Sequence, residues 1–243
     1  MPDTGNTAYE GQDLEALADL KNYQNWIMES FGPFLKGTVL EVGAGSGNIS
    51  RLYVDSAEKA VLLEPAANLI RILQNRFAGR RHVEIVSQYL EEAMQQHSNP
   101  LPRQHFDAAL LVNVLEHVDD DVGMLKRLRS LLKPGAHLLL FVPAGAWLYG
   151  SLDRICRHVQ RYSYDRLAGV VKTAGFTIHR LHYFDAPGVL PWFVVGRLLK
   201  QQRFHAAQAQ RYDRFAVPVI RRLEQKIRPP FGKNLLCIAK REE

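Results

Sequence analysis

The sequence predicts an α/β fold built on a mainly parallel sheet. Short apolar runs alternate with amphipathic helical stretches along most of the 243 residues, and this alternation is typical of right-handed βαβ units. Gly, Pro and acidic residues flank the apolar runs, as they flank strands. The expected strands are Val39–Val42, Ala60–Leu63, Val83–Val86, Ala108–Val112, His137–Val142, Thr177–Tyr183 and Leu235–Ala239.

Helical patterns fill the intervals between these strands. Three consecutive acidic residues, Asp119 to Asp121, place negative charge where a helix begins, and Pro134-Gly135 follows its end. Ser163 can cap the next helix, and Gly175 can close it. The expected helices are Asn48–Val54, Asn68–Phe77, Val122–Leu132 and Tyr164–Ala174.

The alternation stops after Phe184, and about 50 residues precede the last strand. A loop of that length is unusual in a compact domain, so the segment should have its own structure. Its apolar spacing predicts two amphipathic helices, Val189–Arg203 and His205–Arg228. We therefore expect a helical lid over 1–35, a core over 36–183, a basic helical cap over 184–233 and a last strand over 234–243.

Composition limits the class of protein and its location. With 47% hydrophobic and 23% charged residues, the chain resembles an ordinary globular domain rather than a disordered or fibrous one. No apolar run approaches the roughly 18 residues of a membrane-spanning helix, and no apolar signal core stands at the N-terminus. Two cysteines cannot build a disulfide framework or a cysteine zinc site. These features predict a cytoplasmic protein.

The net charge of +6 is distributed unevenly, because residues 1–183 carry −1 and residues 184–243 carry +7. A basic segment attracts nucleic acid, an anionic membrane surface or a phosphorylated small molecule. Equally, it can be a solvated helix face rich in arginine. Nucleic acid is the least favoured partner, since no recognised reader module accompanies the basic segment.

A glycine-rich turn follows the first strand, with Gly43, Gly45 and Gly47 at alternate positions. Such a turn lets a ligand approach the backbone, and we expect a helix N-terminus with free N–H groups behind it. A dinucleotide fingerprint requires a third glycine at the position of Asn48, so its spacing fails. A Walker loop is excluded, because no Gly-Lys-Ser/Thr follows. Glu41 would repel a pyrophosphate and would suit a ligand that carries an ammonium and a sulfonium.

The segment Val39–Asn48 resembles motif I of the class I S-adenosylmethionine-dependent methyltransferases. Later motifs of this family are matched in order by Val61–Pro65, Phe106–Val118 and Leu131–Leu138. The resemblance implies a Rossmann-like fold of seven strands, mainly parallel, with an antiparallel last strand and a helical cap. It also implies S-adenosylmethionine as cofactor, S-adenosylhomocysteine as product, and no metal.

The resemblance assigns roles at the cofactor site. Glu64 ends the second strand and would accept both ribose hydroxyls. Gln88 and Tyr89 stand where the family often has Gly-Asp, so either their side chains or the backbone alone would read the adenine. Tyr23 would donate to the methionine carboxylate, or would only pack its helix on the sheet. The expected cofactor-binding residues are Tyr23, Glu41, Gly43, Ala44, Gly45, Gly47, Glu64, Pro65, Gln88, Tyr89, Asn113 and Val114.

The loop after the fifth strand is rich in Asp, Arg, His and Tyr, and open α/β sheets bind ligands at such an edge. It resembles a loop of bacterial methyltransferases that accompany glycan or lipid-linked sugar assembly, with two departures, at Arg157 and Gln160. A hydroxyl acceptor must lose a proton, so we expect His158 as general base, oriented by Asp153, or His117 instead. A purely structural role for these groups is the alternative. The expected acceptor contacts are Tyr149, Arg161, Tyr162 and Trp192.

Together these observations predict transfer of a methyl group to a hydroxyl, less readily to nitrogen or carbon. The acceptor would be small or lipid-linked, such as a sugar, a prenyl compound or a natural-product intermediate. An acidic or phosphorylated acceptor would suit the basic cap, which could also contact the inner face of the membrane. Two alternatives stay open: a non-catalytic module that binds the cofactor or its product and acts on a membrane or partner through the cap, and an NAD-dependent oxidoreductase, which Asn48 opposes.

Overall fold

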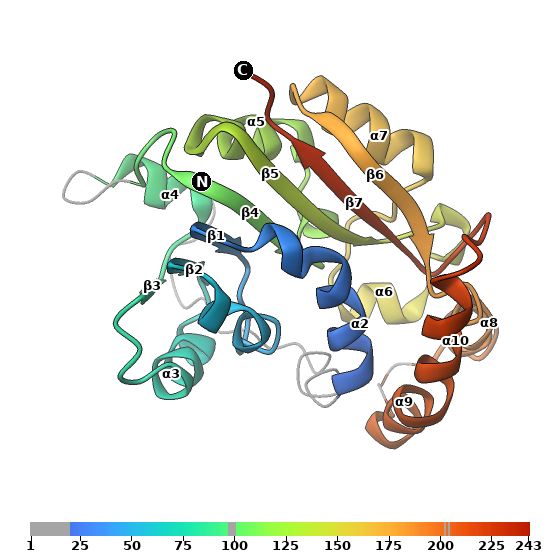
Figure 1. Ribbon diagram of the computed structural model, residues 1–243. Helices are drawn as coiled ribbons and strands as arrows, with labels where there is room; N and C mark the ends of the chain where they lie inside the picture. The colour runs from blue at the N-terminus through green and yellow to red at the C-terminus, as the bar shows by residue number, and fades with distance from the viewer. Residues whose placement is uncertain (1–19, 97–100, 202, 204) are drawn as a thin grey trace.

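The computed structural model describes residues 20–96, 101–201, 203 and 205–243. Strands of this described part form one seven-stranded sheet in the order β3-β2-β1-β4-β5-β7-β6 (Figure 1). The bounds are β1 Thr38–Val42, β2 Lys59–Leu63, β3 Val83–Val86, β4 Phe106–Val112, β5 Leu132–Pro143, β6 Thr177–Phe184 and β7 Asn234–Lys240. The predicted α/β class and all predicted strands are confirmed.

Strand direction follows the expected pattern. β1 is parallel to β2 and β4, and the parallel pairing extends to β3 on one side and β5 on the other. β7 inserts between β5 and β6 and is antiparallel to both. Because the parallel strands end at one edge, the loops after β1, β2, β4 and β5 meet there.

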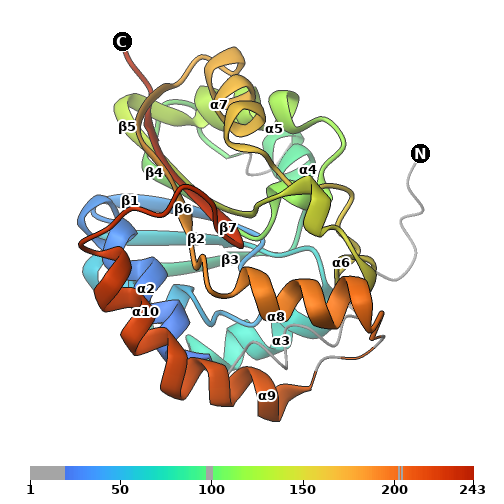
Figure 2. The same cartoon turned by 90° about the vertical axis from the view of Figure 1, so that its right-hand side faces the viewer.

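Helices cover both faces of the sheet and bury two apolar layers (Figures 1 and 2). One layer packs β-strand side chains against α4, α5 and α7. The other packs the opposite face against α2, α3 and α10. The helix bounds are α2 Lys21–Phe31, α3 Ala67–Arg76, α4 Leu90–Gln95, α5 Asp121–Leu131, α6 Ser151–Ile155, α7 Tyr164–Thr173, α8 Val189–Phe193, α9 Ala206–Arg211 and α10 Val217–Glu224.

The predicted helix Asn48–Val54 is wrong. The chain after the glycine turn winds into two short 3₁₀ turns, Ser50–Leu52 and Val54–Ser56. Asn48 donates from its side chain to the Ser46 hydroxyl at 2.8 Å, and such local bonds compete with an α-helical start. The glycine turn is therefore not followed by an α-helix whose N-terminal N–H groups could face a ligand.

The cap is helical, as predicted, but each of its two helices is interrupted. α8 continues into a π-helical turn at Val194–Leu198, and α9 joins α10 through another at Tyr212–Ala216. Residues 1–19 of the expected lid lie outside the described residues, and its described part is α2. Asp213 caps α2, accepting from the backbone N–H of Asn22 and Tyr23 at 3.1 and 2.8 Å.

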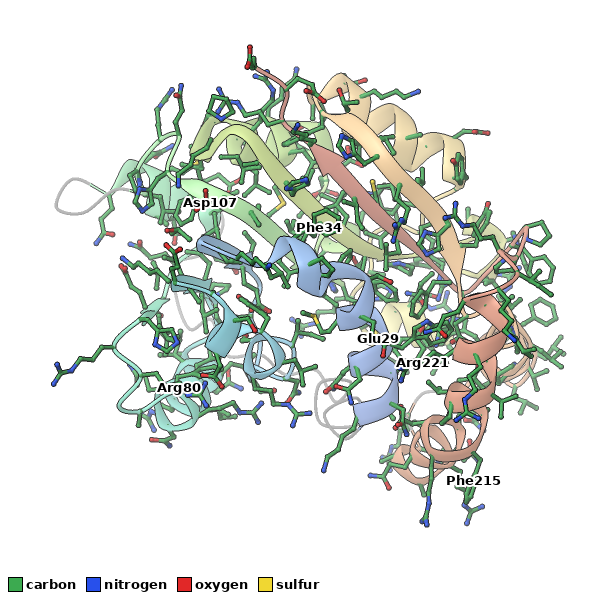
Figure 3. The ribbon with its side chains drawn as sticks, in the orientation of Figure 1. Glu29, Phe34, Arg80, Asp107, Phe215 and Arg221 are labelled. Carbon is green, nitrogen blue, oxygen red and sulfur yellow. The ribbon has the colours of Figure 1, made fainter. Side chains whose placement is uncertain are left out.

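α2 and α10 are also joined at the surface, where Arg221 pairs with Glu29 (Figure 3). α2 and α10 thus pack together beside the sheet. In the described residues, no helix is long and apolar enough to cross a membrane.

Candidate active site

The glycine turn leads from β1 toward the ends of β2 and β4. Gly43, Gly45 and Gly47 have φ angles of +71°, +58° and +78°. These angles lie in the left-handed region, which is strained for residues other than glycine. A Cβ on Gly43 would stand 2.6 Å from Cγ2 of Val114. Glycine at this position therefore lets the turn pack directly against the loop after β4.

Glu64 lies beneath this turn at the end of β2 and is only 5% exposed. Its carboxylate oxygens accept from the backbone N–H of Gly45 at 2.8 Å and of Ala66 at 2.9 Å. Burial raises the pKa of Glu64, and these two hydrogen bonds act against the rise. Since a carboxylate has about four acceptor sites, Glu64 can hold the turn and still accept ribose hydroxyls. Pro65 follows it directly and is half-buried.

Glu41 is a buried carboxylate one residue before the end of β1, with 3% exposure. The Tyr53 hydroxyl donates to it at 2.9 Å. Burial raises the pKa of Glu41 to about 7, partly opposed by the Tyr53 hydrogen bond. A negative charge on this residue is therefore costly, and a cationic ligand group next to the turn would stabilise it.

The positions expected to read the adenine have free hydrogen-bonding capacity. Oε1 of Gln88 is buried and has no hydrogen-bond partner within the described structure, while the neighbouring Tyr89 is 50% exposed. Asn113, at the end of β4, adopts a left-handed φ of +55°. A buried acceptor without a partner, next to the glycine turn, fits an adenosyl ligand at this edge.

Tyr23 does not point to an open cofactor position. Its hydroxyl donates to Oδ1 of Asn234 at 3.0 Å, and its ring packs edge-on against Trp26, Phe141 and Phe184. This is the packing alternative stated for Tyr23, so a contact with the methionine carboxylate stays a prediction.

The loop after β5 is organised by Asp153, which is fully buried. One carboxylate oxygen accepts from Nε of Arg161 at 2.6 Å and lies 2.9 Å from Nδ1 of His158. The other accepts from the backbone N–H of Gly150 at 2.9 Å. Although burial acts to raise it, the bonds from His158 and Arg161 hold the pKa of Asp153 below its ordinary value. Asp153 therefore orients His158 and pairs with Arg161 at the same time.

Glu116 faces the other side of the His158 ring. Its Oε1 lies 3.7 Å from Nε2 of His158, and within the described structure neither carboxylate oxygen has a hydrogen-bond partner. Burial raises the pKa of Glu116 to about 7, while the charge of His158 acts to lower it. The His117 ring is 5.0 Å from the His158 ring. Both histidines considered as bases thus lie at one place, next to the end of β4.

This cluster bears on the expectation that no metal is needed. Glu116, His117 and His158 offer ligand atoms that all lie within 4.8 Å of one another. Carboxylate and imidazole groups are common ligands of divalent ions. The absence of a metal stays a prediction, and a divalent ion would find these ligands if one is required.

The expected acceptor contacts are placed unequally. Tyr162 is fully buried, and its hydroxyl donates to Asp121 at 3.0 Å. It anchors the loop to α5 in this structure, so its contact with the acceptor stays a prediction. Arg161 is also buried and lies 4.9 Å from the Trp192 ring. Tyr149 donates to the backbone oxygen of His158 at 2.8 Å. Tyr149 therefore holds the backbone of His158, and Arg161 holds Asp153, to which the His158 ring is hydrogen-bonded.

Two site residues were not singled out from the sequence. Glu116 lies in the fourth-strand motif next to His117. The sequence signal that could have identified it is an acidic residue beside a histidine, directly after a buried strand. Lys233 lies 4.5 Å from the Tyr23 ring and 2.9 Å from Oδ2 of the buried Asp185. Nothing local in the sequence distinguishes it from the other cations of the cap.

A surface hollow elsewhere does not belong to this site. Phe34, Asp107 and Lys133 line it, together with neighbouring residues, and Asp107 accepts from the backbone N–H of Thr38 at the start of β1. The hollow thus lies at the amino ends of the strands, away from the glycine turn (Figure 3).

The sheet order, the antiparallel β7 and the glycine turn over Glu64 define the class I S-adenosylmethionine-dependent methyltransferases. The chain belongs to the methyltransferase-domain family, whose model matches residues 14–181. The predicted enzyme class is thereby confirmed.

Similarity to individual proteins is more distant. A ubiquinone biosynthesis O-methyltransferase of Serratia proteamaculans is 26% identical over 114 residues, which cover 47% of this chain and 46% of that protein. One from Yersinia pestis is 25% identical over 117 residues. The chain thus spans about half the length of the curated relatives it matches.

Solved structures share the fold. An S-adenosylmethionine-dependent methyltransferase of Mesorhizobium loti has a TM-score of 0.64 at 15% identity, covering 91% of this chain and 100% of that one. Phosphoethanolamine N-methyltransferase 2 of Haemonchus contortus, solved with S-adenosylmethionine, has a TM-score of 0.61 at 16% identity, covering 91% and 53%.

Proposed function

We propose that this methyltransferase modifies a hydroxyl oxygen of a small or lipid-linked acceptor and uses His158 as the general base. The observation that carries the proposal is the buried Asp153–His158 pair at the carboxyl edge of the sheet, with a 2.9 Å hydrogen bond. The names of the O-methyltransferase relatives support an oxygen acceptor. A nitrogen or carbon acceptor would have less use for such a pair.

S-adenosylmethionine, when bound, supplies an electrophilic methyl group on a sulfonium. Gly43 and Gly45 would hold it through the turn, Glu64 would accept from the ribose hydroxyls, and Gln88 would accept from the adenine at the same edge. Glu41 would attract its positive charge. Positioning supplies much of the catalysis in such a transfer.

The loop residues would handle the acceptor proton. Because Asp153 is ionised, its hydrogen bond keeps a proton on Nδ1 of His158 and leaves Nε2 able to accept one. Glu116, 3.7 Å from Nε2, would stabilise the positive imidazolium that results. Arg161 would keep Asp153 in place, as a positioning residue.

The features near the loop favour an amphiphilic acceptor. The Trp192 ring lies 4.9 Å from the Arg161 guanidinium and 5.9 Å from the Lys233 ammonium. Both cations are already paired, Arg161 with Asp153 and Lys233 with Asp185, so the ring supports a prenyl or aromatic body. An anionic end of the acceptor would instead pair with the exposed arginines of the cap. Lipid-linked sugars and hydroxylated prenyl-aromatic compounds are therefore the first acceptors to test.

The test measures S-adenosylhomocysteine release with each acceptor for the wild type, His158→Ala and His179→Ala. His179 is an exposed histidine on β6 and serves as the matched control. We expect His158→Ala to lower kcat about 10²- to 10⁴-fold, the usual contribution of a general base, with unchanged affinity for S-adenosylhomocysteine. Activity of His158→Ala equal to that of His179→Ala would rule out His158 as the base. Repeating the assay with EDTA tests the no-metal expectation, which predicts no loss.

A further inference from the structure

The outer surface of the cap combines exposed apolar side chains with exposed cations. On α8 and its π-helical extension, Leu190, Leu198 and Leu199 are 68%, 62% and 60% exposed. Exposed leucines at such density are unusual on a soluble surface that contacts only water. Gly196, between them in sequence, is buried and packs on Leu152.

The helix formed by α9, the π-helical turn and α10 repeats this pattern. Phe215, Val219, Leu223 and Ile227 recur every four residues and are 56–69% exposed, so they form a stripe along one side of the helix. Phe215 projects from the outer end of the cap (Figure 3). The buried face of the same helix is separate and consists of Asp213, Val217 and Ile220. The side chains of the stripe therefore do not contribute to the hydrophobic core.

All three acidic residues of segment 184–233 are turned inward. Asp185 and Asp213 are 0% and 5% exposed. Glu224 accepts from the backbone N–H of Asp185 and of Ala186 at 3.0 and 2.8 Å. The exposed charges of the described cap are consequently cationic: Arg197, Lys200, Arg203, Arg211, Arg214, Arg222, Lys226 and Arg228.

Apolar side chains flanked by cations, without exposed anions, match the boundary of an anionic bilayer. The apolar groups enter the acyl region while lysine and arginine reach the phosphate groups. Both helical runs of the cap lie at one edge of the molecule (Figures 1 and 2). No described helix can span a membrane, so the contact would be interfacial.

We propose that the cap docks the enzyme on an anionic lipid surface through the Phe215–Ile227 stripe, the exposed leucines of 190–199 and the surrounding cations. A second copy of the chain is the competing occupant, but like-charged caps facing each other would repel. The inference does not depend on methyl transfer or on the acceptor, so its test can fail or succeed separately.

The experiment measures co-sedimentation of the full chain with vesicles of phosphatidylcholine alone and of phosphatidylcholine with phosphatidylglycerol. We expect at least tenfold tighter binding to the anionic vesicles, and weaker binding at high salt. The combined variant Phe215→Ala, Leu223→Ala, Ile227→Ala should lose more than tenfold of this binding. Ile72→Ala, which removes an exposed side chain of α3 (43% exposed), is the apolar control and should not.

A charge pair tests the electrostatic part. Arg214→Gln with Arg222→Gln should weaken binding about thirtyfold, since each basic residue near such a surface contributes about 1 kcal/mol. Arg71→Gln with Lys126→Gln, exposed on α3 and α5, should have no effect. Thermal melts establish that every variant is folded.

Three results would overturn the proposal. The first is no binding to either vesicle, and the second is equal binding to both. The third is a dimer by light scattering that the alanine variant dissociates, because a second copy would then cover the stripe.

Discussion

Replacing Glu41 by glutamine separates the charge of this side chain from its shape. Glu41 is 3% exposed and accepts one hydrogen bond from Tyr53. Glutamine retains the size and an acceptor oxygen but cannot ionise. Because Glu41 is both buried and next to the glycine turn, the change should affect stability and cofactor binding in opposite directions.

The stability effect follows from the pKa of Glu41, which burial raises from 4.5 to about 7. Between these values the folded chain binds a proton that the unfolded chain does not, so stability falls as pH rises through this window. At 1.36 kcal/mol per pH unit, the loss is about 3 kcal/mol once the pH exceeds 7. Glu41→Gln escapes the loss. The unfolding free energy of the variant, measured relative to that of the wild type, should therefore rise by about 3 kcal/mol when the pH is raised from about 5 to about 9.

The binding effect should have the opposite sign. A charge-assisted hydrogen bond contributes about 1.5–3 kcal/mol, so removing the carboxylate should weaken binding of S-adenosylhomocysteine, which carries an ammonium, roughly 10- to 100-fold. Urea unfolding followed by tryptophan fluorescence measures the first effect, and calorimetric titration near pH 8 measures the second.

Glu58→Gln is the matched control, because Glu58 is an exposed carboxylate before β2. It should change neither quantity. If Glu41→Gln shows the same stability difference from wild type at both pH values, the carboxylate does not titrate in this window and the burial argument fails. If affinity is unchanged, Glu41 has only a structural role.

Three further substitutions test other parts of the site. Gly43→Ala places a methyl group 2.6 Å from Cγ2 of Val114 at a φ of +71°. It should cost about 1–3 kcal/mol of unfolding free energy and weaken S-adenosylhomocysteine binding. Wild-type stability of this variant would contradict the close packing. Gln88→Ala removes a buried acceptor that lacks a partner within the described structure. Calorimetry should therefore show about fivefold weaker binding of S-adenosylhomocysteine, with no loss of melting temperature. Unchanged affinity would mean that the backbone alone reads the adenine. Asp153→Asn leaves the Arg161 guanidinium buried without its carboxylate and should cost about 3–5 kcal/mol in urea unfolding; a cost below about 1 kcal/mol would show that this pair is not effectively buried.

The regular elements were predictable because their signals are local. α3 and α7 begin and end within one residue of their predicted bounds, since apolar spacing and the Ser163 cap mark their ends. The segment after Gly47 was mispredicted, because a polar contact between Asn48 and Ser46 competes with helix formation. Such short-range competition is not visible in apolar periodicity.

The site was predictable only in part. The glycine turn and Glu64 carry a spacing signal, and the structure brings them together through a 2.8 Å hydrogen bond from Gly45. The burial of Tyr162 was not predictable, because a polar side chain in a polar loop gives no sign of it; its hydroxyl donates in the interior to Asp121, 41 positions away. Glu116 meets His158 in the same way, across 42 positions of sequence. Contacts of this range depend on how the strands are ordered.

Calorimetric titration of the wild-type chain with S-adenosylmethionine, S-adenosylhomocysteine and NADH tests the central assignment most directly. The glycine turn over Glu64 and the failed dinucleotide spacing at Asn48 predict micromolar binding of both sulfur ligands and no binding of NADH. Binding of NADH, with neither sulfur ligand bound, would contradict the account.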